Sequence, residues 1–213
     1  MELRVKICGI TKVEQGRAIA QLGATALGFI CVPGTPRYIP AEQIRAIVEQ
    51  LPSDGSRCDR VGVFLNATID EICRIVEISN LNCVQLHGNE SIEFCDALRS
   101  RFSDVEIIKA LRIKTVADLV QSSIYETHID TLLLDAYHPE QAGGTGETID
   151  WSTLKEFHPN CAWFLAGGLN PDNVLDALGL VNPDGIDLSS GVEKAPGDKD
   201  LERVNQLFAV LRQ

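Results

Sequence analysis

The sequence alternates between short apolar segments and longer amphipathic segments along its whole length. The apolar segments show little period-two alternation, which is typical of strands that are buried on both faces. We predict strands at Leu3–Ile7, Ala26–Ile30, Arg60–Leu65, Asn82–Leu86, Glu106–Leu111, Thr131–Leu134, Trp163–Ala166 and Gly185–Leu188. We predict helices at Val13–Leu22, Pro40–Leu51, Thr68–Ile78, Glu90–Phe102, Thr115–Ser122, Trp151–Phe157, Pro171–Leu180 and Asp200–Leu211. About eight strand–helix units predict an α/β fold, a (βα)8 or TIM barrel, with residues 1–213 forming one domain.

Such barrels usually take about 250 residues, so the loops of this chain are expected to be short. The competing architecture is an open, doubly wound sheet, but no G-x-G-x-x-G motif follows the first predicted strand. Two helix starts carry the spacing of a capping box, Thr11 with Glu14 and Thr68 with Glu71. A third, Asn170-Pro171, fits an N-cap followed by proline in the first helical turn.

Composition narrows the class of protein. The net charge of −11 argues against a nucleic-acid partner, because phosphate backbones select basic surfaces. No apolar run approaches the roughly 20 residues that span a bilayer, and the first residues resemble neither a signal peptide nor a transit peptide. The seven cysteines are scattered without a C-x-x-C pair, which argues against disulfides and a zinc site. We therefore expect a cytoplasmic protein that associates with neither membrane nor nucleic acid.

The first predicted strand leads into Cys8, within Lys6-Ile7-Cys8-Gly9-Ile10-Thr11. Parallel α/β folds place their chemistry at the carboxyl ends of the strands. A helix that begins nearby favours the thiolate and lowers the pKa of a thiol. Free cysteine is also among the residue types most often buried in a core, so this stretch by itself leaves both interpretations open.

Cationic and imidazole side chains follow three further strands. Arg37 is the sole cation of the stiff loop at residues 31–38, and its planar fork matches a carboxylate or a phosphate. His87 precedes a glycine at the end of the fourth strand. Lys109 and Arg112 could contact an anion after the fifth. Arg37 could instead be a solvated arginine, and His87 a hydrogen-bonded structural histidine. At least one of Lys109 and Arg112 could simply be exposed to solvent.

Carboxylates stand at the ends of the sixth and eighth strands. Asp135 follows three leucines, and such apolar surroundings should raise the pKa of its carboxyl. A raised pKa is what a general acid needs near neutral pH. The alternative for Asp135 is a residue that caps a helix or a turn. Asp187 lies within the eighth strand and could contact a polar group of a substrate.

Glycine-rich stretches surround the last two strands. They are Gly143-Gly144-Thr145-Gly146, Ala166-Gly167-Gly168-Leu169 and Ser189-Ser190-Gly191. Barrels often hold phosphate after strands seven and eight, where glycines let backbone N–H groups approach an oxyanion. The sequence shows neither a metal-ligand cluster nor a nucleotide-cofactor motif. Together these features predict acid–base chemistry on a phosphorylated small molecule, without a metal or cofactor.

These motifs resemble the phosphoribosylanthranilate isomerase family of tryptophan biosynthesis from one end of the chain to the other. The matching pieces are Lys6-Ile7-Cys8-Gly9, Thr35-Pro36-Arg37-Tyr38, Val61-Gly62-Val63-Phe64, Gln85-Leu86-His87-Gly88, Leu134-Asp135, Gly143-Gly144-Thr145-Gly146, Ala166-Gly167-Gly168-Leu169 and Asp187-Leu188-Ser189-Ser190-Gly191-Val192-Glu193. The family's fold is a (βα)8 barrel, in agreement with the alternation above.

The resemblance implies an Amadori rearrangement of N-(5-phosphoribosyl)anthranilate to 1-(2-carboxyphenylamino)-1-deoxy-D-ribulose 5-phosphate. By the same resemblance Cys8 is the general base and Asp135 the general acid. It assigns Arg37, His87 and Asp187 to substrate binding. It assigns the glycine-rich loops in the last third of the chain to binding the phosphate. The implied phosphate-binding residues are Gly144, Gly167, Gly168, Ser190 and Gly191. Family members include monomers and homodimers, and the sequence does not distinguish the two.

Three other interpretations remain open. One is a relative of the histidine-pathway isomerase, which relies on aspartates after strands one and five, where this chain has Cys8 and Ala110-Leu111. A second is a relative of indole-glycerol-phosphate synthase, which carries catalytic lysines and an N-terminal extension. A third is a barrel that binds a phosphorylated ligand without catalysis. The remaining six cysteines are expected to be structural, with Cys31 the nearest to the predicted pocket mouth.

Overall fold

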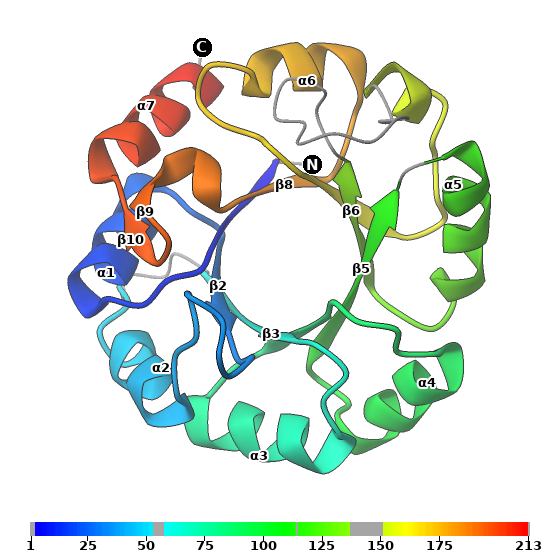
Figure 1. The fold of residues 1–213 in the computed structure, drawn as a ribbon, viewed down its shortest axis with the longest axis horizontal. Coiled ribbons are helices and arrows are strands. Elements are labelled where there is room, and N and C mark those ends of the chain that lie inside the picture. Colours follow the sequence, from blue (N-terminus) through cyan, green and yellow to red (C-terminus); the bar gives the residue numbers. More distant parts are fainter. Residues whose placement is uncertain (1–2, 53–57, 114, 137–150, 213) are drawn as a thin grey trace.

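The computed structural model describes residues 3–52, 58–113, 115–136 and 151–212. Eight parallel strands close into a barrel in which each strand pairs with the next one in sequence and β8 pairs with β1 (Figure 1). The strands are β1 (Arg4–Cys8), β2 (Ala26–Ile30), β3 (Asp59–Phe64), β4 (Cys83–Leu86), β5 (Glu106–Ile113), β6 (Thr131–Ala136), β7 (Ala162–Ala166) and β8 (Gly185–Leu188). The predicted (βα)8 architecture is thus confirmed.

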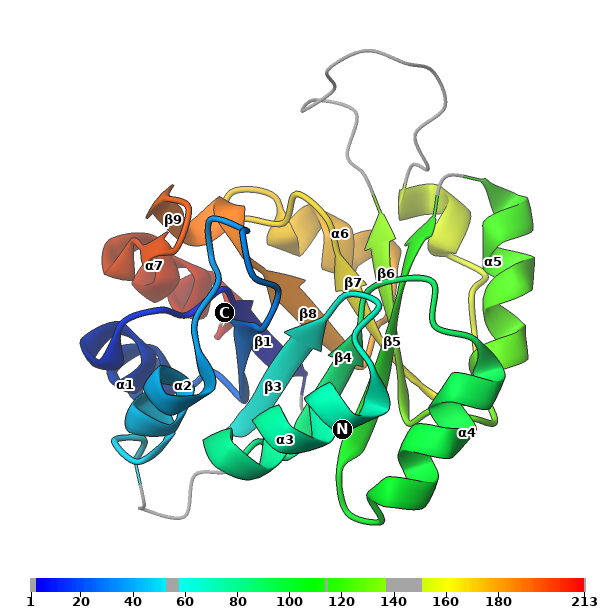
Figure 2. The same cartoon turned by 60° about the horizontal axis from the view of Figure 1, so that its bottom comes forward.

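The helices form an outer ring around this barrel (Figures 1 and 2). They are α1 (Val13–Leu22), α2 (Ala41–Val48), α3 (Ile69–Ser79), α4 (Ile92–Arg101), α5 (Val116–Ser122), α6 (Val174–Leu180) and α7 (Leu201–Leu211), with short 3-10 segments at Ser123–Tyr125, Trp151–Leu154 and Ser190–Val192. A small antiparallel hairpin of β9 (Glu193–Ala195) and β10 (Asp198–Lys199) lies between β8 and α7. The sequence did not predict this hairpin.

The hydrophobic core has two parts, as a closed barrel requires. A large cluster fills the space between strands and helices, with fully buried side chains such as Ile7, Leu27 and Leu132. A smaller cluster fills the barrel itself and includes Val61, Phe164 and residues from four other strands. Strands that are buried on both faces carry apolar residues at nearly every position, which explains the weak alternation in the sequence.

Strand and helix bounds agree with the predictions at several elements. β2, β8 and α1 coincide with the predicted ranges. β5 and β6 run two residues further than predicted, because their ladder continues through Arg112 paired with Asp135 and Ile113 paired with Ala136. Asp135 therefore lies within a strand rather than after it. The helix predicted at residues 151–157 is a 3-10 segment that ends at Leu154.

Of the predicted helix starts, the capping box at Thr68 and Glu71 is confirmed. The one at Thr11 and Glu14 is wrong: Lys12 precedes the helix, and the Thr11 hydroxyl donates instead to the backbone oxygen of Gly197.

The predicted N-cap at Asn170 is also wrong. A turn at residues 171–173 precedes α6, whose N-cap residue is Asn173. The side-chain oxygen of Asn170 accepts from the backbone N–H of Asp172 in that turn. The local signal therefore marks the turn that leads into the helix rather than the helix itself.

Candidate active site

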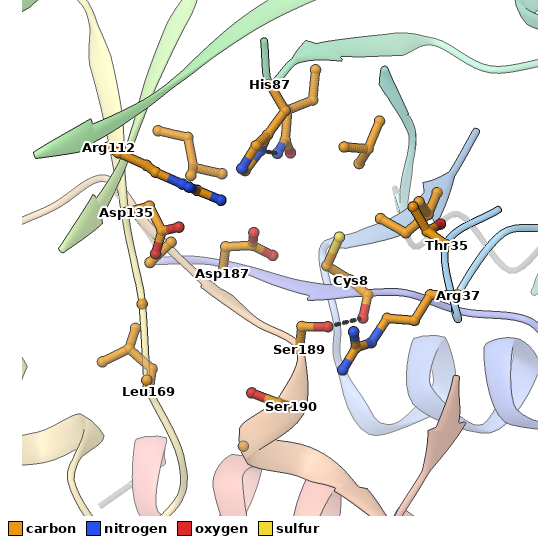
Figure 3. Close-up of a pocket in the computed structure, with 18 of the residues that line it drawn as sticks. Cys8, Thr35, Arg37, His87, Arg112, Asp135, Leu169, Asp187, Ser189 and Ser190 are labelled. Atoms are coloured by element: carbon orange, nitrogen blue, oxygen red, sulfur yellow. Dashed lines mark hydrogen bonds between the residues drawn. The ribbon is translucent and has the colours of Figure 1, made fainter. Parts of the chain in front are cut away.

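The carboxyl ends of the strands surround a cavity of about 510 Å³. Nine of the residues predicted from the sequence line it together (Figure 3): Cys8, Arg37, His87, Asp135, Gly167, Gly168, Asp187, Ser190 and Gly191. The tenth, Gly144, lies outside the described residues. The barrel thus brings residues from strand ends more than 100 positions apart in sequence to one site.

Cys8 lies at the end of β1, and its position depends on the strand beside it. A Cβ on Gly28 of β2 would lie 2.6 Å from Cys8 Sγ, so the missing side chain of Gly28 leaves room for the thiol. After Cys8 the chain turns at Gly9, whose φ of +84° is in the left-handed region. The Ser189 hydroxyl donates to the Cys8 backbone oxygen over 3.1 Å. Cys8 is therefore packed against Gly28 of β2 and held through its backbone oxygen by Ser189, which follows β8.

The electrostatic surroundings of Cys8 differ from the sequence-based expectation. Burial raises the pKa of the Cys8 thiol, while the nearby charges of Lys6 and Lys199 lower it and that of Asp187 raises it. The net direction is upward, so the expected lowering of the thiol pKa by a helix N-terminus is wrong. The reason is that the thiol is almost fully buried, with 6% of Cys8 exposed.

Asp135 extends from β6 into the side of the cavity that also holds His87 and Arg112 (Figure 3). Burial raises the pKa of the Asp135 carboxyl; His87 and Arg112 oppose this, and Asp187 adds to it. The predicted upward direction is confirmed, with burial as the main cause. A carboxyl with a raised pKa can donate a proton nearer to neutral pH.

His87 is oriented by a second polar residue of β4. The Gln85 side-chain nitrogen, assigned from this contact, lies 3.0 Å from His87 Nδ1. With Nδ1 as the acceptor, the neutral ring carries its proton on Nε2. Burial lowers the pKa of His87, which favours this neutral form. His87 is thus a fixed, uncharged hydrogen-bond donor at the cavity wall.

Arg37 is held by the hairpin that follows β8. Its Nε and Nη2 atoms donate to the Glu193 carboxylate over 2.6 to 3.1 Å. Glu193 is 3% exposed at its side chain and also accepts from Lys199 and from the backbone of Gly197. One edge of the guanidinium fork is therefore already used within the protein. The end that carries Nη1 remains for a ligand.

The side of the cavity formed after β7 and β8 is built from backbone. Gly167 and Gly168 have φ values of +92° and +67°. A Cβ on Gly191 would lie 2.0 Å from the backbone oxygen of Leu169, so the two loops approach more closely there than a side chain allows. Ser189 and Ser190 add hydroxyls to the same wall. Such a surface suits an oxyanion.

Several polar residues of this site were not singled out from the sequence. Gln85 and Ser189 line the cavity, and Lys6 and Glu193 lie behind it. Of the two cations suggested at the fifth strand, Arg112 lines the cavity, whereas Lys109 is not part of that lining. Lys109 is buried, and its ammonium donates to Glu90 and to the backbone oxygens of Leu86 and Gly88.

One group in the described part of the chain brings three candidate metal ligands together: Asp59, Cys83 and Glu106, with ligand atoms within 4.8 Å of one another. Arg4 donates to both carboxylates, so their charges are used within the fold. These residues lie at the amino-terminal ends of their strands, opposite the cavity. None of the described helices is long and apolar enough to cross a membrane.

Comparisons with known proteins agree with this geometry. The sequence profile described as "N-(5'phosphoribosyl)anthranilate (PRA) isomerase" matches residues 5–210. Proteins of that name from Nostoc punctiforme and Trichormus variabilis are each 59% identical over 209 residues, 98% of this chain and 98% of theirs.

Solved structures agree as well. The phosphoribosyl anthranilate isomerase of Thermotoga maritima superposes with a TM-score of 0.87 at 37% identity, covering 99% of both chains. A further such isomerase, solved with reduced 1-(o-carboxyphenylamino)-1-deoxyribulose 5-phosphate, gives 0.86 at 35% identity, also covering 99% of both chains. The chain therefore belongs to the N-(5'-phosphoribosyl)anthranilate isomerase family.

Proposed function

We propose that this enzyme catalyses the Amadori rearrangement of N-(5-phosphoribosyl)anthranilate to 1-(2-carboxyphenylamino)-1-deoxy-D-ribulose 5-phosphate, a step of tryptophan biosynthesis. The observation that carries the proposal is the placement of Cys8 and Asp135 on different sides of one cavity that also has a glycine-lined wall. The reaction needs one group that donates a proton and one that accepts a proton, acting on the same substrate.

In the first step Asp135 protonates the ribose ring oxygen. The C1–O bond breaks as the nitrogen lone pair forms a Schiff base at C1. Asp135 is suited to this step because burial raises the pKa of its carboxyl. His87, as a neutral donor, and Arg112 lie beside it and can contact polar groups of the open-chain sugar.

In the second step the Cys8 thiolate removes the proton from C2. The electron pair of the C–H bond shifts toward the imine nitrogen and gives an enolamine, which tautomerises to the ketone. The charges of Lys6 and Lys199 favour the thiolate against the effect of burial. The rearrangement oxidises C2 and reduces C1 within the same molecule, so the electrons balance inside the substrate and the steps above need no external oxidant or reductant.

The remaining predicted residues would hold the substrate. Arg37 would bind the anthranilate carboxylate through the end of its guanidinium that Glu193 leaves available. Asp187 would accept from a sugar hydroxyl. The phosphate would be bound by the last loops, through Gly144, Gly167, Gly168, Ser190 and Gly191.

We further propose that residues 1–213 act as one catalytic domain in the cytoplasm, without nucleic-acid or membrane partners, as a monomer or homodimer. A Thermotoga maritima structure, 34% identical with a TM-score of 0.85, is described as mutually generated monomers of a dimeric isomerase, so both forms have been described for that one relative.

The test is the loss of anthranilate-sugar fluorescence with freshly made substrate, for wild type, Cys8→Ser and Asp135→Asn. We expect turnover by wild type and a loss of about 10²- to 10⁴-fold in each variant, the usual effect of removing an acid or a base. Cys95→Ser and Asp96→Asn on α4, outside the cavity lining, serve as matched controls that keep activity per folded molecule.

An inert wild type that still binds a sugar phosphate would leave the fold and remove the proposed reaction. Turnover of another aldose phosphate in its place would favour a different isomerase of this barrel group. If Cys8→Ser is barely slower than wild type, the reaction stands and Cys8 is not its base.

A further inference from the structure

A buried ion pair joins the cavity wall to a residue behind it: Asp187 lines the cavity and Lys6 does not. Lys6 of β1 and Asp187 of β8 are partners in the parallel ladder, and Lys6 Nζ lies 3.0 Å from Asp187 Oδ1. The Lys6 side chain is fully buried, and that of Asp187 is 10% exposed. Lys6 is two residues from Cys8 on the same strand, so both side chains point to the barrel interior. The pair thus lies between the acid and base of the proposed mechanism.

Other buried lysines in the described chain are bound differently. Lys109 donates to two backbone oxygens and to Glu90, and Lys199 to Ser189 and Glu193. Their ammonium groups are satisfied by several acceptors. Within the described residues, Lys6 Nζ and Asp187 Oδ1 lie at ion-pair distance, and neither atom makes a hydrogen bond of regular geometry. The Cys8 thiol is the other group that favours a charged Lys6.

Stability does not account for such a pair. Replacing a buried ion pair by apolar side chains of similar size is often neutral or stabilising, because both charges must be desolvated. The interior around Lys6 already holds an apolar cluster that larger side chains could extend. A charge retained in this place therefore points to a role in the neighbouring site.

The two ends of the pair act on different catalytic groups. The charged or titratable groups that influence Cys8 are Lys6, Asp187 and Lys199, with Arg37 and Cys31 also coupled to it. Burial raises the pKa of Cys8, and Lys6 provides the largest opposing influence. On the other side, burial and Asp187 both raise the pKa of Asp135, against His87 and Arg112. The cation thus favours an ionised thiol, and the anion favours a protonated carboxyl.

We propose that the Lys6–Asp187 pair is a positioning element whose cation stabilises the Cys8 thiolate when it forms and whose anion keeps the reactive proton on Asp135. Lys6 does not contact substrate, since it is fully buried and absent from the cavity lining. It acts through the thiolate. Asp187 combines this role with the substrate contact proposed above. The inference rests on the proposed function, because it assigns the pair to that reaction.

The test measures ionisation of the thiol without turnover. The rate of alkylation of Cys8 by iodoacetamide is followed against pH on the tryptic peptide that contains Cys8, by mass spectrometry. In Lys6→Met we expect the midpoint of this profile to rise by at least about one pH unit, the effect of removing a nearby opposite charge. In Asp187→Asn we expect it to fall, because the thiolate becomes the counter-ion of Lys6.

A matched control comes from the other side of the barrel. Lys109→Met removes the ammonium of a buried ion pair that does not line the cavity, so we expect lower stability with an unchanged alkylation midpoint. In turnover, Lys6→Met should lower kcat/KM at neutral pH at least tenfold, with recovery as the pH is raised. A merely structural role for Lys6 would not restore activity in this way.

The alkylation midpoint is expected to shift in opposite directions in Lys6→Met and Asp187→Asn, which makes the experiment decisive. Coincident midpoints in wild type and Lys6→Met, or an upward shift in Asp187→Asn, would overturn the inference. Asp187→Asn keeps the proposal testable if Lys6→Met does not fold. If wild type fails to convert phosphoribosylanthranilate, the proposed function fails whatever the alkylation profile shows. If wild type turns over and the midpoints do not move, only the role of the pair is lost.

Discussion

The property that suits Asp135 to act as an acid also lowers the stability of the fold. Burial raises the pKa of its carboxyl above the ordinary 3.8. A carboxyl with a raised pKa in the folded state destabilises the fold once it ionises, so the cost appears as the pH rises past 3.8 and is complete above the raised pKa.

We therefore expect Asp135→Asn to melt a few degrees higher than wild type at pH 8, while catalysis is lost. The gain should shrink at pH 5, where more of the wild-type carboxyl keeps its proton. Thermal unfolding at both pH values, followed by circular dichroism, measures this. Asp176→Asn, at an exposed position on α6, should show no such pH-dependent gain. A variant less stable than wild type at pH 8 would contradict the assignment of burial as the main cause.

Residues at strand ends could be predicted from sequence because a strand fixes where its last side chain points. Cys8 and Asp135 each follow an apolar run, and the barrel topology then places both at one face. Lys6 and Glu193 could not be assigned in this way. Their partners, Asp187 and Arg37, are distant in sequence, and pairing across that distance leaves no local pattern.

At the scale of elements, the β9–β10 hairpin connects three parts of the site. Glu193 at its start binds Arg37 of the loop after β2 and Lys199 of β10. The hairpin is also joined to α1, because the Gln15 side-chain nitrogen donates to Asp198, and Lys12, which precedes α1, pairs with the same carboxylate. The hairpin thereby fixes the guanidinium that we assign to the substrate carboxylate.

We expect Glu193→Gln to raise KM for phosphoribosylanthranilate by about tenfold, with a smaller change in kcat, because uniform binding is lost rather than the proton transfers. The variant should also be less stable, since the buried Lys199 loses its counter-ion. Steady-state kinetics and thermal melts measure the two effects.

Asp198→Asn is the matched control on the same hairpin, because asparagine keeps an oxygen that can accept from Gln15 and only the exposed pair with Lys12, worth little, is lost. A fall in kcat with unchanged KM in Glu193→Gln would show that Arg37 acts in the chemistry instead.

A predicted helix cap was confirmed where the hydrogen-bonding residues are close in sequence and was wrong where the side chain binds a distant residue. The capping box at Thr68 formed because both of its hydrogen bonds join residues three apart. At Thr11 the same spacing failed because the hydroxyl is bound by Gly197, 186 positions away. The β9–β10 hairpin was missed because its strands are only three and two residues long.

For the whole molecule, the two ends of the barrel serve different purposes. The carboxyl ends of the strands carry the cavity, whereas the amino-terminal ends carry a cluster of Arg4, Asp59 and Glu106. Arg4 of β1 reaches residues of β3 and β5, which are not its neighbours in the sheet, so these bonds cross the barrel interior. Arg4 also lies 4.8 Å from the ring centre of Phe164. In such barrels this end contributes stability rather than catalysis.

Arg4→Met should therefore lower stability and spare activity. It leaves two partly buried carboxylates without their shared cation, which costs about 3 kcal/mol, the low end for a broken buried pair because these side chains keep some exposure. For a chain of this length that corresponds to a melting temperature lower by roughly 6–12 °C. Arg45→Met, which removes an exposed pair with Glu49, should stay within about 0.5 kcal/mol of wild type.

The pH dependence of the stability lost in Arg4→Met shows whether the charge of Arg4 is its cause. Burial alone would raise the pKa of Glu106, but its bonds with Arg4 outweigh this and hold it below the ordinary 4.5. A carboxyl with a lowered pKa contributes stability above 4.5 that is lost as the pH falls through its value in the fold. The difference between wild type and Arg4→Met should thus be full at pH 7 and shrink below pH 4.5. Urea unfolding at pH 7 and at a pH below 4.5 measures this difference in stability. The kcat/KM per folded molecule should be unchanged at pH 7. A penalty that is independent of pH would mean that Arg4 stabilises the barrel by packing against Phe164 rather than by its charge.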